Sequence, residues 1–309
     1  MNTLLYTPPT PGTETVIGDD NPPEFSSGHI TVIQASSAWR VIDFRELYAY
    51  RDLYRFLTWR SIKVRYAQSA VGIGWAILQP AFQIAMFTLV FGRLAQIDSD
   101  GVPYAAFSLA TIVAWTYFSN ALTAATDSLV GNADMISKVY FPRVILPLSA
   151  ASAALFDFAI AFTFAITVLI VFGFIPTTGI VMLPVLIALM ALTAFGLGLW
   201  ATALAIQYRD VKYAMTFLVQ LAMYASPVIY PTSKLPETYT LPGNVTIWPQ
   251  SIYAINPMVG VLEGFRSALI GTRAMPYDWI AIGLLSATLI TISGMVYFRS
   301  REKVFADVA

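Results

Sequence analysis

Six stretches of the sequence are apolar enough to cross a membrane as helices, and they constrain the fold more than any other feature. A helix needs about 20 mostly apolar residues to cross roughly 30 Å of hydrocarbon, because lipid offers its backbone no hydrogen-bond partners. The fifth stretch is short and stops at Pro227 and Pro231. The stretches are 71–95, 104–125, 144–174, 180–206, 214–230 and 279–298. They predict an all-α membrane protein with six transmembrane helices.

The composition agrees with a membrane protein and excludes several kinds of chemistry. Mean hydropathy is +0.65, and 12% of residues are charged, about half the share of a soluble domain. The formal net charge is zero, so no overall basic field indicates a nucleic-acid partner. The chain has no cysteine, and its one histidine is His29. We therefore expect no disulfide, no metal site and no catalytic residues.

The positions of lysine and arginine predict the orientation in the membrane. Fourteen of the 18 basic residues lie before the first stretch, between the second and third, between the fourth and fifth, or after the sixth. The other side holds only Arg93, Lys234, Arg266 and Arg273. This distribution predicts a multi-pass protein with both termini in the cytoplasm.

The region before the first stretch divides into two parts. Residues 1–38, rich in Pro, Thr, Ser and Gly, are expected to form a disordered or extended cytoplasmic tail without a signal peptide. Residues 39–70 are charged, yet apolar side chains such as Tyr54 and Leu57 recur near helical spacing. We expect an amphipathic helix in the cytoplasmic interface, followed by a transmembrane domain over 71–309. An ordinary solvated helix beside the membrane is the alternative.

The long segment between the fifth and sixth stretches has two halves. Residues 231–249 are rich in Pro and Thr and are expected to form a loop. Asn256 then offers a helix cap and Pro257 a first helical residue, but the helix that follows is short and contains Glu263 and Arg266. It is predicted to be a re-entrant or interfacial helix on the outer side, packed against protein.

Six short motifs, in order along this topology, carry a resemblance to a known family. They are YRFLTWRSIKVRY (54–66) with GIGWAILQP (72–80), KVYFPRVILP (138–147), YRDV (208–211), SPVIYP (226–231), NPM (256–258) and EGFR (263–266). Together they resemble the ABC-2 polysaccharide export permeases, which serve O-antigen, capsule and teichoic acid. Only the tail before about Ile30 falls outside the resemblance.

The resemblance implies a homodimer in the bacterial inner membrane, surrounded by membrane lipids, with a channel down the dimer axis through which a lipid-linked polysaccharide moves. It also implies two copies of a separate ATPase that binds ATP and Mg. The residues agree in part, because the sequence has no Gly-rich phosphate loop and no internal repeat. We expect no cofactor in this chain and no ATP hydrolysis by it alone.

A polysaccharide path needs aromatic rings that stack on sugar faces and amides that bind hydroxyl groups without charge. Such residues recur along one face of the first and fifth stretches, the helices that flank the channel in the family. They are Trp75, Gln79, Phe82, Gln83 and Met86, and then Phe217, Gln220 and Tyr224. The alternative is a helix–helix contact, which polar and aromatic stripes in membrane helices commonly form.

The loop between the second and third stretches is the best placed to couple to an ATPase. It contains exposed basic and aromatic residues on the predicted cytoplasmic side, and a proline that fixes its exit. The predicted coupling residues are Asn132, Lys138, Tyr140, Phe141, Pro142 and Arg143. A plain basic loop that obeys the orientation rule is the alternative.

Asp157 is the only carboxylate well inside a predicted span. An intramembrane acid is a functional hypothesis by default, because an ionised group is costly there. No basic residue lies at similar depth in another predicted span, so we expect Asp157 to be neutral or bonded to hydroxyl, amide or backbone donors. A structural role is favoured over proton coupling.

Three other functions remain open. An ABC-2 permease for a drug, haem or another lipid would need no continuous path for sugar. A membrane glycosyltransferase or acyltransferase would need clustered carboxylates or histidines, whereas Asp98 and Asp100 are isolated in a loop. A proton-driven transporter would need more than the single buried Asp157.

Overall fold

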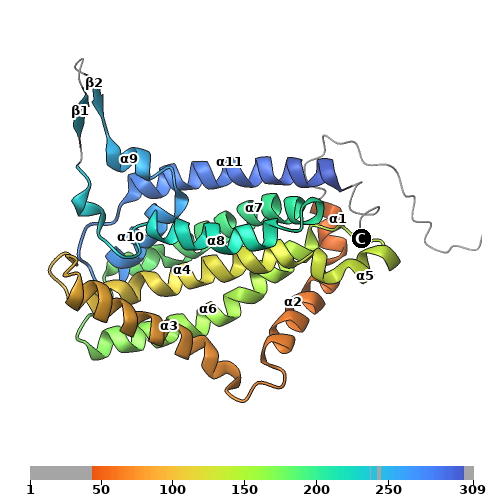
Figure 1. Ribbon diagram of the computed structural model, residues 1–309, viewed down its shortest axis with the longest axis horizontal. Coiled ribbons are helices and arrows are strands. Elements are labelled where there is room, and N and C mark those ends of the chain that lie inside the picture. The colour runs from red at the N-terminus through yellow and green to blue at the C-terminus, as the bar shows by residue number, and fades with distance from the viewer. Residues whose placement is uncertain (1–43, 237, 242–244, 303–309) are drawn as a thin grey trace, which may run out of the picture. The chain divides into compact units, whose positions relative to one another are not determined.

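The computed structural model of the chain describes residues 44–236, 238–241 and 245–302. The expected tail, residues 1–38, and the start of the expected interface helix lie outside this part. Within it, the predicted helical architecture is confirmed (Figure 1).

Five helical segments of the described part are long and apolar enough to cross a membrane. They are η1–α3–η2 (Gly72–Gly74, Trp75–Phe87 and Thr88–Leu94), α4 (Tyr104–Asp127), α6 (Ile145–Val171), η4–α7 (Thr178–Met182 and Leu183–Gln207) and α11 (Tyr277–Arg301). Each overlaps one of the predicted stretches. The stretch predicted at 214–230 instead forms α8 (Val211–Tyr224), a helix of 14 residues followed by non-helical backbone. The predicted count of six spans therefore depends on how residues 225–230 continue α8.

The amphipathic helix expected within 39–70 is observed as α1 (Phe44–Ala49) and α2 (Arg51–Tyr66), with a break at Tyr50. Its apolar side packs against protein: Leu57 is buried, and the Tyr54 hydroxyl donates to Ser152 Oγ on α6 at 2.8 Å. The helix periodicity thus marks a contact with α6.

The segment after α8 differs in part from its prediction. Residues 231–249 were expected to form a loop, but they contain η5 (Thr232–Lys234) and an antiparallel pair, β1 (Tyr239–Leu241) with β2 (Val245–Ile247). Thr, Val and Ile are β-branched, and that preference outweighs the prolines around them. Short helix α9 (Pro249–Tyr253) follows.

Helix α10 (Pro257–Leu269) begins where the sequence predicts a cap. The Asn256 side chain accepts a hydrogen bond from the Met258 backbone N–H at 3.1 Å, and Pro257 needs no partner at the first helical position. Every residue of α10 is buried. It is therefore an internal helix, held between α4, α7 and α11.

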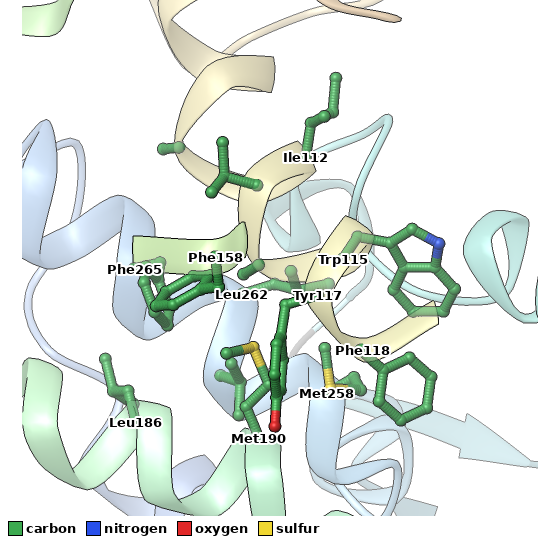
Figure 2. Packing of buried hydrophobic residues seen from close by; sticks show 14 of the residues in the cluster. Ile112, Trp115, Tyr117, Phe118, Phe158, Leu186, Met190, Met258, Leu262 and Phe265 are labelled. Atoms are coloured by element: carbon green, nitrogen blue, oxygen red, sulfur yellow. The ribbon is translucent and has the colours of Figure 1, made fainter. Parts of the chain in front are cut away.

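Helix α4 lies between α6 and α7 and forms the centre of the core (Figure 1). Figure 2 shows Trp115, Tyr117 and Phe118 of α4 among side chains of α6, α7 and α10. On the other side of α7, small residues bring α11 close: a Cβ atom at Gly196 would lie 2.5 Å from Thr291 Oγ1. By contrast, α3 contributes only Pro80 to the buried residues.

Candidate functional site

Gln83 brings the two predicted path helices together. Its Nε2 donates to Met223 Sδ on α8 at 3.9 Å, and its Oε1 accepts from Thr116 Oγ1 on α4 at 3.4 Å. A side chain on α3 thus connects α4 and α8. The structure places the predicted residues of the first and fifth stretches on two helices that share α4 as a neighbour.

The other predicted path residues point away from the core. Phe82 is 67% exposed and Tyr224 is 56% exposed. The remaining exposed members of this set are Trp75, Gln79, Met86, Phe217 and Gln220. We call these seven residues with Gln83 the α3–α8 face.

The α3–α8 face carries no charge. Helix α3 has no charged residue in its 13 positions, and the one charged side chain of α8, Lys212, lies in its first turn. Lys212 Nζ lies 3.4 Å from an Asp127 carboxylate oxygen at the end of α4. Rings and neutral amides therefore provide its chemistry: ring stacking and hydrogen bonding without ion pairing.

The non-helical backbone after α8 is held by side chains of α4 and α10. The Tyr104 hydroxyl donates to the Ile229 carbonyl at 2.8 Å, and Thr111 Oγ1 donates to the Val228 carbonyl at 3.2 Å. Arg266 Nη2 donates to the Val228 carbonyl as well, at 3.3 Å. Buried carbonyl groups that no helix satisfies thus find protein donors.

Arg266 also forms a buried ion pair that the sequence did not reveal. Its Nη1 lies 2.7 Å from Glu263 Oε1, and the two side chains are 1% and 5% exposed. Glu263 Oε1 accepts from Thr232 Oγ1 at 2.9 Å, and the guanidinium lies 3.8 Å above the Phe107 ring centre. Opposite charges at i and i+3 in an otherwise apolar helix were the available signal. In the sequence these two charges exclude a membrane span, but they do not indicate that the pair is buried.

The structure corrects part of the predicted coupling segment. The segment forms η3 (Val130–Asn132), α5 (Ala133–Lys138) and an extended stretch. Phe141 was expected to be exposed, but it is 4% exposed and packs with Leu57 and Ile136 in a second apolar cluster. Tyr140, beside it, is 64% exposed, and Lys138 is exposed too. Successive side chains of extended backbone point to opposite sides, so Phe141 anchors the segment and Tyr140 faces outward.

The remaining predicted coupling residues hold this segment to its neighbours. The Asn132 amide oxygen accepts from Arg60 Nη1 at 3.4 Å, and Arg143 Nη1 donates to the Glu302 carbonyl at 2.5 Å. Pro142 is half-buried between Phe141 and Arg143. The exposed surface of the segment is therefore centred on Lys138 and Tyr140.

Asp157 has the hydroxyl donor that the prediction allowed, and also a basic partner that it did not expect. Its carboxylate forms an ion pair with Arg65 and accepts a hydrogen bond from the Tyr66 hydroxyl, both at the end of α2. Burial raises the pKa of the Tyr66 phenol further above neutral. Arg65 lies outside the predicted spans, so its distance from Asp157 along the sequence gives no sign of this contact. Because α2 packs along α6, Arg65 lies beside Asp157 of that helix.

An ion pair and a hydrogen bond connect the loop before α4 with η5. Lys234 Nζ lies 2.9 Å from an Asp98 carboxylate oxygen, and Ser233 Oγ donates to Asp100 at 2.7 Å. Hydrogen bonding to the Lys234 ammonium holds the pKa of Asp98 below its usual value. Among the described residues, no group of three or more His, Cys, Asp or Glu side chains could hold a metal ion.

Comparison with known proteins places these features in a family context. Residues 52–270 match the family described as ABC-2 type transporter. The chain is 25% identical over 264 residues to an O-antigen export system permease protein of Myxococcus xanthus, covering 85% of this chain and 97% of that protein. A permease of the same description from Klebsiella pneumoniae is 24% identical, with 83% and 95% covered. A polysialic acid transport protein of Escherichia coli is 20% identical, with 79% and 91% covered.

Proposed function

Since the chain belongs to the ABC-2 type transporter family, we propose that it is the permease subunit of an ATP-driven exporter that moves a lipid-linked polysaccharide across the bacterial inner membrane. The descriptions of its relatives support this cargo class, because they name O-antigen export and polysialic acid transport. The chain binds and guides its cargo and makes no covalent bond. ATP and Mg are bound by the partner ATPase.

The observation that carries the proposal is the uncharged α3–α8 face. A polymer has to slide past many equivalent positions, so no single contact can hold it tightly. Ring stacking and amide hydrogen bonds are exchanged easily for the next sugar unit, whereas a fixed charge would hold water or an ion. A permease for a drug, haem or other lipid would not need rings and amides spread over two helices, from Trp75 to Met86 and from Phe217 to Tyr224.

Six membrane crossings follow if α8 and residues 225–230 together form the fifth. Helix α8 accounts for about 21 Å at 1.5 Å per residue. The backbone beyond it is buried and its carbonyls accept from Tyr104, Thr111 and Arg266. Irregular backbone is tolerated at membrane depth under that condition. With six crossings, both termini are cytoplasmic and α10 is a re-entrant helix on the outer side.

A closed path requires a second copy of the chain. The α3–α8 face is open on one side, so a single chain cannot surround a polymer in lipid. We propose a homodimer whose two α3–α8 faces enclose the path, with two ATPase copies on the cytoplasmic side. Lys138 and Tyr140 provide the exposed surface for the ATPase, and Phe141 fixes the segment that presents them.

Three substitutions in the α3–α8 face test this proposal. Phe82→Ala and Tyr224→Ala each remove a ring, and Gln83→Glu adds a charge where α3 meets α4 and α8. We expect each to reduce surface polysaccharide while ATPase assembly is retained, with Gln83→Glu at least as severe. Leu285→Ala on α11 is the matched control, because its side chain is 64% exposed and lies outside the face.

The measurement is the amount of surface polysaccharide at matched expression, together with the ATPase that copurifies with the chain. If all three variants display polysaccharide at the parent level, the path does not follow this face. Equal loss in Leu285→Ala would show that exposed membrane-facing positions are sensitive in general.

A further inference from the structure

A groove of about 450 Å³ lies on the side of α3 that packs against α6, with α4 as its floor. Its volume falls within the range of about 300–1,000 Å³ typical of small-molecule sites. The lining is apolar along most of its length, with side chains such as Ile84, Leu109, Phe164 and Val168. The one charged residue in the lining is Arg93. No residue of the α3–α8 face contributes to it.

The groove follows a distortion of the helix. Residues Thr88–Leu94 form a π-helix, in which the Ala95 N–H donates to the Val90 carbonyl five residues earlier at 2.8 Å. This spacing places Thr88 and Arg93, five residues apart, on the same side of the helix, and both line the groove. Such π-helical turns are uncommon and occur frequently at functional sites.

Among the described residues, neither polar side chain in this stretch has a hydrogen-bond or ion-pair partner. The Thr88 hydroxyl is buried and has no hydrogen-bond partner among the described residues. Thr163 and Thr167 on the neighbouring helix instead donate to the carbonyl four residues earlier, at 2.8 and 2.9 Å. Arg93 forms no ion pair with any carboxylate in the part of the chain that the structure describes. A groove with an unpaired cation and an unpaired hydroxyl fits a ligand with a negative charge and an acceptor.

The length of the groove matches one membrane leaflet. Ala81 and Arg93 are twelve positions apart and both line it, which is about 18 Å at 1.5 Å per residue. Half of the hydrocarbon core measures about 15 Å. In the proposed orientation Arg93 lies at the outer surface and Ala81 near the middle of the membrane. An acyl chain that begins at the outer headgroup region would therefore follow the apolar lining inward.

We propose that this groove binds one anionic phospholipid of the outer leaflet. Its phosphate pairs with Arg93, an ester carbonyl accepts from the Thr88 hydroxyl about one helical turn deeper, and one acyl chain lies along Ile84 and Ala81. This inference rests on the proposed membrane orientation but not on the cargo. The groove is occupied by a resident lipid and not by the cargo's anchor, because it lies on the α6 side of α3 while Gln83 faces α8. The lipid completes the packing of the helix that protein covers least.

The test uses the full-length protein in nanodiscs and a reporter placed in the groove. The native chain has no cysteine, so Leu89→Cys, which lies in the lining, can carry a single fluorophore. Leu284→Cys on α11 is the matched control, because the two leucines are 47% and 46% exposed. The bilayer is phosphatidylcholine with a small fraction of lipid whose hydrocarbon chains are brominated and quench nearby fluorophores. That lipid is phosphatidylglycerol, phosphatidylcholine or a polyprenyl phosphate.

We expect brominated phosphatidylglycerol to quench position 89 at least twofold more than brominated phosphatidylcholine, and both to quench position 284 equally. Arg93→Gln should abolish the difference at position 89, as should Ala85→Phe, which fills the groove. Lys234→Gln, which removes another outer basic residue, should leave it unchanged. Equal quenching at position 89 by the two phospholipids, or an undiminished difference in Arg93→Gln, would overturn the proposal. Stronger quenching by the polyprenyl phosphate would assign the groove to the cargo's anchor and overturn the choice of a resident phospholipid.

Discussion

Arg266 and Glu263 show how a charged pair can sit in the interior of an apolar protein. Removing a charge from water is costly unless it is paired and its other donors and acceptors are bonded. Here the guanidinium reaches Glu263, the Phe107 ring and the Val228 carbonyl, while Glu263 also accepts from Thr232. The pair therefore fixes the non-helical backbone that follows α8, at Val228 and at Thr232.

This arrangement predicts a strong and non-additive effect on stability. Glu263→Gln and Arg266→Met each leave one buried charge without its partner, and each should lower the free energy of unfolding by about 3–5 kcal/mol. The double substitution should cost less than the sum, since no uncompensated charge remains. Thermal unfolding of the purified protein measures these effects, with Lys234→Gln as an exposed control. Additive losses would show that the two side chains act independently.

Asp157 makes a second residue-level prediction. Because Arg65 and Tyr66 account for its charge and one acceptor oxygen, we expect a structural role at the junction of α2 and α6. Asp157→Asn should lower stability by about 1–3 kcal/mol, and export at constant ATP should not depend on a proton gradient. Export assayed in inverted vesicles with and without a protonophore tests this. A protonophore that stops export by the parent protein while ATP is held constant would point to proton coupling instead.

At the scale of elements, the segment between α4 and α6 combines a buried anchor with an exposed tip. Phe141→Ala removes a side chain that is 4% exposed, so it should destabilise the protein by about 3–5 kcal/mol. Tyr140→Ala removes one that is 64% exposed and hydrogen-bonded to Glu46, so it should weaken ATPase binding and lower the unfolding temperature far less than Phe141→Ala. Copurification of the ATPase and thermal unfolding separate the two effects. The assignment fails if Tyr140→Ala retains full ATPase binding and export.

Local sequence signals predicted the elements better than their contacts. Apolar length located five long helices to within a few residues, and Asn256 with Pro257 located the start of α10. The β1–β2 pair was missed because its strands have three residues each, too few for a periodic signal. The burial of Phe141 depends on side chains distant in sequence, such as Leu57. No local pattern reports such contacts.

For the candidate site too, the sequence predicted the local residue pattern but not the contacts between distant residues. The ring and amide spacing on α3 and α8 is a local pattern, and the structure places those residues on an exposed surface connected by Gln83. Their role as a path remains a prediction. The ion pair of Asp157 was missed because α2 comes from outside the predicted spans and reaches α6 by tertiary packing.

For the molecule as a whole, the orientation in the membrane can be tested at two positions. Lys138→Cys should react with a membrane-impermeant thiol reagent only from the cytoplasmic side, and Thr240→Cys only from the outer side. The absence of native cysteine makes each label unambiguous. If position 240 is labelled only when the reagent can reach the cytoplasmic side, the segment between α8 and α11 does not lie on the outer side.

The most direct test of the central claim follows the polysaccharide itself in cells that lack this chain. Lipid-linked polymer should accumulate on the cytoplasmic side and disappear from the cell surface. The parent gene should restore surface display, whereas the Phe82→Ala variant at matched expression should restore it only in part. Full surface display in the deletion strain, or loss of surface polymer without accumulation inside, would contradict the account.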